Sequence, residues 1–177
     1  MSISIAIDLD TVLNTLNGDW IKLYNEDFND NLTNDDFTDW DMTKFVKPEC
    51  GKLIYDYLKI PGFFRNLGVQ PYAQEVTTWM AKEFDLCIAT AYVPEACMDK
   101  CKWVDEHFPH IGAEKVIFIN DKSKLNADYL IDDGGHNIEA FKGIGLIFDQ
   151  PYNRYLEESA SRIRVKDWRD IGRYFRG

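Results

Sequence analysis

The sequence lacks a hydrophobic run long enough to cross a membrane and lacks any recognisable targeting segment. A membrane-spanning helix needs about 20 consecutive, mostly apolar residues, and every apolar run in this chain is far shorter. The opening residues, MSISIAIDLD, carry no basic group and too few apolar residues for a signal peptide before the acid at Asp8. We therefore expect no membrane partner and a cytoplasmic location.

The chain also lacks basic excess. Its 30 acidic residues outnumber the 20 Lys and Arg, which gives a formal net charge of −10. Proteins that bind long nucleic acids rely on Lys and Arg to neutralise many phosphates, so this composition argues against such a partner. A small anionic substrate is still compatible, because a bound divalent cation supplies a local positive charge.

Cysteines are few, and low-complexity segments and internal repeats are absent from the sequence. The four cysteines show no paired CxxC spacing, and Cys97 and Cys101 lie four residues apart in a segment that we expect to be helical. On that face, together with Val104 and Phe108, we expect them to act as small core hydrophobes. At 177 residues and 45% hydrophobic content, the chain fits one domain, or one domain with a small insertion.

Short apolar runs alternate with helical patterns along most of the chain. The runs that we expect to be strands are Ser2–Ile7, Leu86–Ala89, Val116–Ile119, Tyr129–Ile131, Ile144–Phe148 and Ile163–Val165. Helical spacing of apolar residues covers Ala73–Phe84, and Pro94 opens a helix to about Phe108. A final helix follows the last strand. This alternation predicts an α/β fold with a Rossmann-like, three-layer parallel sheet core.

The interval 15–72 breaks the alternation and is rich in Asp, Asn and aromatic residues. We interpret it as a small helical cap inserted after the first strand. It would cover the crevice that parallel sheets form at the carboxyl ends of their strands. The predicted Rossmann-like core then comprises residues 1–14 and 73–177.

An insertion of this size needs aromatic anchors for its own small core, so most of its rings are expected to be structural. Roughly two or three are expected to reach the crevice and stack on a nucleobase. The strongest candidates for this base pocket are Phe28, Trp40, Phe63 and Phe64.

Acidic residues follow two of the expected strands. Asp8 and Asp10 come directly after the first strand, and Asp132 and Asp133 come after Tyr129–Ile131. Because the carboxyl ends of parallel strands meet at one edge of a sheet, these four acids should converge. A cluster of carboxylate oxygens suits Mg²⁺, which takes few carboxylates together with water and phosphate oxygens.

The same edge gathers groups suited to phosphoryl transfer. We expect Asp8 to attack phosphorus and form an acyl-phosphate, while Asp10 protonates the leaving oxygen and later deprotonates the attacking water. The hydroxyl of Thr90 and the backbone N–H of Ala91 are expected to hold phosphate oxygens. Lys122 is expected to pair with Asp8 and the phosphate.

These residues form an ordered set that resembles the four motifs of haloacid dehalogenase superfamily phosphatases. The set consists of Asp8-Leu9-Asp10-Thr11-Val12, Ile88-Ala89-Thr90, Asp121-Lys122 and Ile131-Asp132-Asp133. The spacing over nearly the full length resembles one branch, the 5′(3′)-deoxyribonucleotidases. The segments 61–67, 128–133 and 148–153 support that branch.

The resemblance implies a Rossmann-like core, a small helical cap after the first motif, and magnesium-dependent dephosphorylation of nucleoside monophosphates. It implies that the metal is held by the Asp8 side chain, the Asp10 backbone carbonyl and one acid of the pair at 132 and 133. Asp133 is our choice, with Asp132 as the alternative. Thr11 stands where the family commonly has Gly, and Asn14-Thr15 replace a more usual small residue followed by an acid.

Other functions remain open at this stage. The same chemistry could act on a sugar phosphate or another small phosphomonoester. A non-catalytic nucleotide-binding module is a further alternative, although a sensor would not need both Asp8 and Asp10. The sequence leaves open the base, the sugar, the 5′ or 3′ ester, and whether the protein is a monomer or a homodimer.

Overall fold

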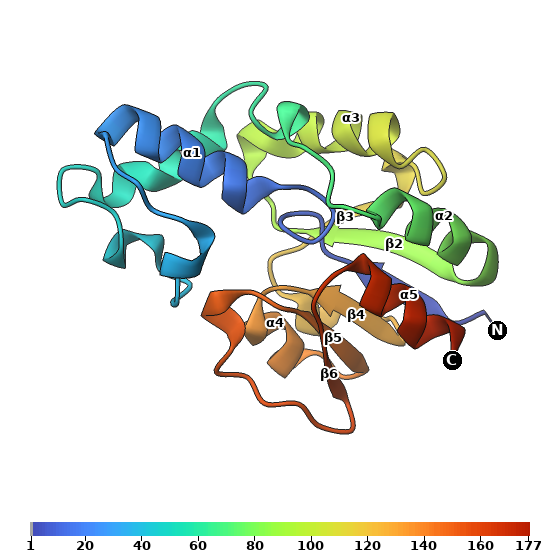
Figure 1. Cartoon of the computed structure of the whole chain (residues 1–177). Helices are drawn as coiled ribbons and strands as arrows, with labels where there is room; N and C mark the ends of the chain where they lie inside the picture. The colour runs from blue at the N-terminus through green and yellow to red at the C-terminus, as the bar shows by residue number, and fades with distance from the viewer. Residues whose placement is uncertain (1) are drawn as a thin grey trace.

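A six-stranded parallel sheet organises the computed structural model, which describes residues 2–177 (Figure 1). The strand order is β3-β2-β1-β4-β5-β6, and every neighbouring pair is parallel. The strands are β1 (Ser4–Ile7), β2 (Asp85–Thr90), β3 (Val116–Phe118), β4 (Tyr129–Asp132), β5 (Ile144–Phe148) and β6 (Arg162–Val165). The predicted parallel α/β sheet is confirmed.

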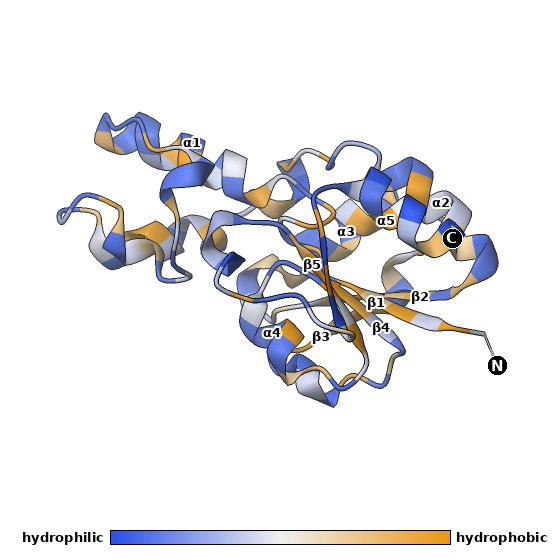
Figure 2. Cartoon of the chain, turned by 60° about the horizontal axis from the view of Figure 1, so that its bottom comes forward, coloured by the Kyte–Doolittle hydropathy of each residue, from blue (hydrophilic) through white to orange (hydrophobic). Residues whose placement is uncertain are grey.

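Helices cover both faces of this sheet. On one face lie α2 (Ala73–Glu83), α3 (Cys97–His107) and α5 (Trp168–Arg176), and on the other lies α4 (Gly135–Ala140). Side chains of β1 alternate between the faces, because successive residues of a strand point in opposite directions. Ile5 and Ile7 pack with α2 and α3, whereas Ala6 packs toward α4. The strands are the most hydrophobic elements of the interior, and the helices carry hydrophilic residues on their outer sides (Figure 2).

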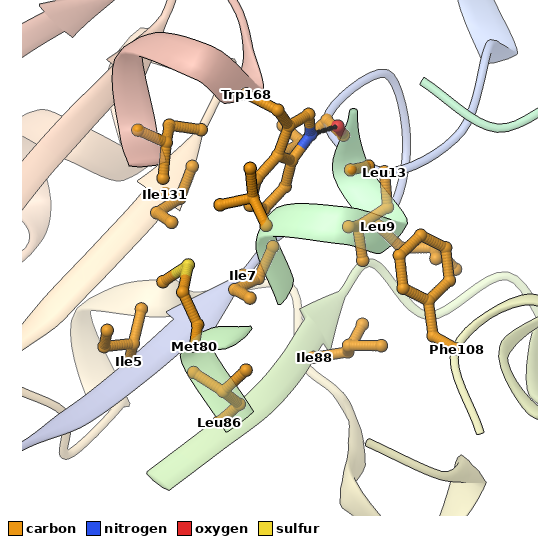
Figure 3. Close-up of a cluster of buried hydrophobic side chains, with 14 of the residues drawn as sticks. Ile5, Ile7, Leu9, Leu13, Met80, Leu86, Ile88, Phe108, Ile131 and Trp168 are labelled. Carbon is orange, nitrogen blue, oxygen red and sulfur yellow. Dashed lines mark hydrogen bonds between the residues drawn. The ribbon is translucent and has the colours of Figure 1, made fainter. Parts of the chain in front are cut away.

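The larger apolar cluster joins α5 to the loop that follows β1 (Figure 3). Trp168 is fully buried, and its indole Nε1–H donates to the backbone carbonyl of Val12 at 2.7 Å. Asp167 is the N-cap of α5. Its carboxylate accepts hydrogen bonds from the N–H groups of Arg169 and Asp170 at 2.8 and 3.2 Å. Helix α5 therefore supports the loop that carries Asp8 and Asp10.

Between β1 and α2 the chain forms α1 (Leu16–Phe28) and a series of 3₁₀ helices. These are Asn34–Asp36, Met42–Lys44, Gly51–Lys59 and Phe64–Asn66. Their apolar residues form a separate cluster that includes Trp20, Tyr24, Phe37 and Ile54. The division into a core of residues 1–14 and 73–177 and a cap of residues 15–72 stays a prediction, and residue 1 lies outside the described residues.

Helix α3 differs from its expected orientation. The segment opens with a 3₁₀ turn at Pro94–Ala96, and the α-helix starts at Cys97. Its fully buried face is formed by Lys100, Trp103 and Val104. The inward face of α3 is therefore rotated away from the face that carries Cys97 and Cys101, which we expected to be buried. Both cysteines are only half-buried.

Within residues 2–177, none of the helices combines the length and the apolar composition that crossing a bilayer requires.

Candidate active site

Two neighbouring strands end in the acids of the site. Asp8 follows β1, and its N–H donates to the carbonyl of Ile131 in β4 at 2.8 Å. Asp132 ends β4 and Asp133 follows it. Carboxylate oxygens of Asp8, Asp132 and Asp133 lie within 4.8 Å of one another, and all three residues are buried. The sheet edge thus brings these predicted acids together.

One buried lysine lies among these carboxylates. Nζ of Lys122 is 2.7 Å from Oδ1 of Asp8 and 2.5 Å from Oδ2 of Asp132. Burial raises the pKa of Asp8 to about 7. The positive charge of Lys122 lowers this pKa, whereas the negative charges of Asp132 and Asp10 raise it. Burial and the charges of Asp8 and Asp132 also raise the pKa of Asp133 well above its usual value. Three carboxylates therefore lie together, and Lys122 pairs with two of them.

The two adjacent acids have different surroundings. Asp132 is fully buried and accepts hydrogen bonds from Lys122, from the N–H of Gly134 at 2.7 Å and from Asn137 Nδ2 at 3.2 Å. Asp133 accepts a hydrogen bond from the hydroxyl of Tyr152 and lines the cavity described below. Protein donors surround the oxygens of Asp132, whereas Asp133 faces the open space.

Asp10 points to a different set of partners. Its Oδ2 accepts from Nζ of Lys100 at 2.6 Å and from the hydroxyl of Thr90 at 3.3 Å, and its Oδ1 accepts from Asn14 Nδ2 at 3.1 Å. Thr90 is fully buried and its oxygen also accepts from Lys100 at 2.9 Å. The Thr90 hydroxyl therefore contacts Asp10 and Lys100 instead of lining the cavity, whereas Ala91 does line it.

The turn after Asp10 adopts a backbone conformation that favours glycine. Thr11 has φ +67°, which costs a β-branched residue about 1–2 kcal/mol. The side-chain oxygen of Asn14 accepts from the N–H groups of Thr11 and Leu16, each at 3.0 Å. Two positions that depart from the common family pattern thus lie in one turn, where Asn14 compensates part of the strain at Thr11.

A cavity of about 370 Å³ opens above the acids. Its walls come from the strand ends and from the 15–72 segment. The residues of that segment are Leu16, Asn17, Trp20, Trp40, Met42, Tyr55, Leu58 and Phe64. Those from the strand ends and following loops include Asp8, Asp10, Ala91, Lys122, Asp133, His136 and Tyr152. A cavity of this size and mixed lining suits a small organic ligand with a charged group.

Only two of the four predicted base-pocket rings line this cavity. Trp40 and Phe64 do. Phe28, at the end of α1, stacks on Tyr24 with ring centroids 5.3 Å apart, and Phe63 packs edge-on against Phe64 at 5.5 Å. Phe28 and Phe63 therefore belong to the apolar cluster of the 15–72 segment, because that segment needs them for its own packing.

Tyr152 was given no role by the sequence reasoning. Its hydroxyl accepts from Asn17 Nδ2 at 3.1 Å and donates to Asp133. Burial and the nearby Asp133 raise the pKa of Tyr152 well above its usual value, so the phenol keeps its proton and acts as a donor. Its ring also meets Trp40 edge-to-face at 5.4 Å. The signal for Tyr152 in the sequence was its position in the segment 148–153, one of the segments that support the resemblance to deoxyribonucleotidases.

Lys100 was also missed. It is buried in α3 and contacts Asp10 and Thr90. Its position three residues before Trp103 and four before Val104 puts it on the inward face of a helix, which was the signal in the sequence.

The fold matches solved haloacid dehalogenase-like hydrolases over nearly the whole chain. A haloacid dehalogenase-like family hydrolase from Xanthomonas campestris aligns with a TM-score of 0.61 and 14% identity, covering 99% of this chain and 96% of that one. The HAD-hydrolase YfnB from Bacillus subtilis, described as bound to magnesium, aligns with a TM-score of 0.62 and 15% identity, covering 99% of both. The chain thus has the fold of a haloacid dehalogenase-like hydrolase.

Sequence comparison narrows this class. The sequence matches the model of the 5′ nucleotidase, deoxy (Pyrimidine), cytosolic type C protein family over residues 1–175. The 5′(3′)-deoxyribonucleotidase of Clostridium acetobutylicum is 45% identical over 166 residues, covering 93% of this chain and 90% of that protein. The 5′(3′)-deoxyribonucleotidase of Bacillus subtilis strain 168 is 34% identical over 171 residues, covering 96% of each. The chain belongs to this nucleotidase family and is a phosphatase-type hydrolase, which confirms the resemblance drawn from the motifs.

Proposed function

We propose that the protein is a magnesium-dependent phosphomonoesterase that dephosphorylates (deoxy)ribonucleoside 5′- or 3′-monophosphates through an aspartyl-phosphate intermediate. The observation that carries this proposal is the cluster of Asp8, Asp132 and Asp133 around Lys122, at the base of a cavity lined by aromatic rings. The names of the bacterial deoxyribonucleotidases to which the chain is similar support the nucleotide substrate.

The donor set fits a divalent cation. Three buried carboxylates lie close together, and Lys122 pairs with only two of them. Burial, and then the repulsion between these acids, raises the pKa of Asp8 and of Asp133. A hard cation relieves this repulsion through oxygen ligands. Asp8, the backbone carbonyl of Asp10 and Asp133 would hold magnesium. Asp132 is the weaker choice because protein donors already occupy its oxygens. When bound, the ion neutralises the charge of the phosphoryl group.

The residues of the chain divide the reaction between them. A carboxylate oxygen of Asp8 attacks phosphorus, the ester P–O bond breaks, and Asp10 gives a proton to the leaving oxygen. Asp10 then takes a proton from the water that attacks the aspartyl-phosphate, and inorganic phosphate leaves as the bond to Asp8 breaks. Lys122 and the N–H of Ala91 hold the non-bridging oxygens.

The upper part of the cavity accounts for the nucleoside. Stacking of a base on an aromatic ring contributes about 1–3 kcal/mol, and Trp40 and Phe64 offer such rings. On this proposal, residues 15–72 are a cap over a core of residues 1–14 and 73–177. The protein works in the cytoplasm, in deoxyribonucleotide catabolism, as a monomer or homodimer, without a polymeric nucleic acid or a membrane as partner.

A panel of phosphomonoesters, assayed for phosphate release with magnesium and with EDTA, tests the proposal. Nucleoside monophosphates should be hydrolysed only with magnesium, and Asp8→Asn should lose about 10⁴-fold or more in kcat. Asp121→Asn is the matched control, because Asp121 adjoins Lys122 in sequence but is exposed and bonds Ser123 and Lys124.

Each other outcome would redirect the assignment. Release from sugar phosphates alone would change the substrate class, and nucleotide binding in calorimetry without turnover would favour a silent binding module. Turnover that survives EDTA would remove the magnesium requirement.

A further inference from the structure

Lys100 is the second buried lysine at this edge of the sheet, and the proposed chemistry gives it no role. It is 1% exposed. Its Nζ has three acceptors: Oδ2 of Asp10 at 2.6 Å, the hydroxyl oxygen of Thr90 at 2.9 Å and the carbonyl of Ala91 at 3.3 Å. Burying an ammonium is unfavourable unless it is paired and hydrogen-bonded. Here each of its three N–H groups has a partner.

Lys100 is separated from the cavity. Asp10, Ala91 and Phe64 line the cavity, and Lys100 does not. The ring of Phe64 covers the ammonium, with Nζ 4.6 Å from the ring centroid, and Phe64 is itself buried. A substrate in the cavity therefore does not touch Lys100, and any effect of Lys100 on the reaction must pass through a residue that it contacts.

Asp10 is the contacted residue whose side chain takes part in the proposed reaction. Its side chain is 18% exposed and lines the cavity, whereas Thr90 is fully buried and does not. Three donors restrain the Asp10 carboxylate: Lys100 and Thr90 on Oδ2, and Asn14 on Oδ1. The contacts from Thr90 and Asn14 are neutral and long, at 3.3 and 3.1 Å. The contact from Lys100 is short and charge-assisted, so it contributes most to fixing the carboxylate.

We propose that Lys100 is a positioning residue that fixes the Asp10 carboxylate toward the leaving group of the substrate. This inference rests on the proposed function, in which Asp10 exchanges a proton with that group. A displacement of about 1 Å at a reacting group can cost about 10²-fold in rate. Lys100 thus acts on both proton transfers of Asp10, to the leaving oxygen and from the attacking water, and leaves substrate binding alone. Only the transfer to the leaving oxygen differs between esters, and kcat/KM reports it because this constant covers the steps up to departure of the leaving group.

This role makes the effect of Lys100 depend on the leaving group. A nucleoside alkoxide is a poor leaving group and needs the proton from Asp10. A p-nitrophenolate is stable without it. Loss of Lys100 should therefore slow hydrolysis of a nucleoside monophosphate much more than hydrolysis of p-nitrophenyl phosphate.

The test compares Lys100→Met, Asp10→Asn and the double variant with the wild-type protein, in saturating magnesium. The control is Lys102→Met, since Lys102 is an exposed lysine of the same helix. For Lys100→Met we expect kcat/KM on the nucleotide to fall about 10²-fold through kcat, while KM changes by less than about threefold. With p-nitrophenyl phosphate, kcat/KM should fall less than about tenfold. The double variant should match Asp10→Asn within about threefold, because both changes remove one function.

Two results would overturn the assignment. Equal losses of kcat/KM on both esters would mean a structural role, and a double variant about tenfold slower than Asp10→Asn would mean that Lys100 acts independently of Asp10. If Lys100→Met fails to fold by circular dichroism, Lys100→Gln, which keeps a donor, is judged by the same criteria.

The two proposals fail in different ways. A wild-type protein that hydrolyses neither ester overturns the phosphatase proposal, and the role of Lys100 with it. An active wild-type protein whose Lys100→Met and Lys100→Gln variants match it on both esters overturns the role of Lys100 alone.

Discussion

Replacing Lys122 by methionine removes the ammonium that pairs with Asp8 and Asp132 while keeping an unbranched side chain. In the folded protein Lys122 is 3% exposed, and its Nζ contacts Asp8 and Asp132 at 2.7 and 2.5 Å. Removing one partner of a buried ion pair costs about 3–5 kcal/mol, because the other charges stay buried without compensation. For a chain of this length, 1 kcal/mol shifts Tm by about 2–4 °C. We therefore expect Lys122→Met to lower Tm by about 6–20 °C in EDTA at about pH 8, above the pKa of about 7 of Asp8.

Thermal melts followed by circular dichroism measure this shift. Lys124→Met is the matched control, because Lys124 lies in the same 3₁₀ turn but is 74% exposed and pairs with the exposed Asp121 at 3.3 Å. Exposed pairs contribute about 0–1 kcal/mol, so its Tm should stay close to that of the wild-type protein. Magnesium should restore part of the loss in Lys122→Met by binding the folded state. Equal Tm values for the two variants would refute the reasoning that these carboxylates are charged and depend on Lys122.

The remaining tests concern an acid, a tyrosine and a tryptophan of the site. In EDTA, the free energy of unfolding should fall as pH rises from about 5 to about 8. The reason is that burial raises the pKa of Asp8 from 3.8 to about 7, so the folded state loses a proton in this range that the unfolded state has already released. Urea melts measure this free energy at each pH. If it depended on pH equally in Asp8→Asn and in the wild-type protein, this explanation would be contradicted. Tyr152→Phe removes the hydroxyl that donates to Asp133 and should raise the magnesium concentration for half-maximal activity about 10–100-fold. An unchanged requirement would argue against Asp133 as a ligand. Trp40→Ala should raise KM for the preferred nucleotide about 5- to 150-fold through lost stacking and leave KM for ribose 5-phosphate nearly unchanged, whereas equal increases would place Trp40 away from the base.

The sheet and the acids of the site could be predicted because their signals are local. Asp8 follows one short apolar run and Asp132 ends another. Because the carboxyl ends of parallel strands meet at one edge of a sheet, the two acids are predicted to lie close together. Lys122 was found for the same reason, since it lies just beyond β3. The alternation of strands and helices was sufficient to predict the layered α/β architecture, because each strand is apolar and each helix has one apolar stripe.

The rest of the site depends on tertiary packing. Lys100 lies within a helix, where lysine is almost always exposed, and only its spacing to Trp103 marked it as inward-facing. The 15–72 segment is mostly short 3₁₀ helices and loops, which give no long periodic pattern to show which rings face the cavity. This is why Trp40 was distinguished from Phe28 only by the structure.

The hydrogen bond from Trp168 to the carbonyl of Val12 joins residues 156 positions apart in the sequence. The loop that carries Asp8 and Asp10 is synthesised well before its packing partner in α5. A nascent chain therefore holds its acids without a finished active site until Trp168 has left the ribosome. Premature termination before Trp168 would leave every proposed catalytic residue in place and still yield an enzyme whose first loop has lost its support.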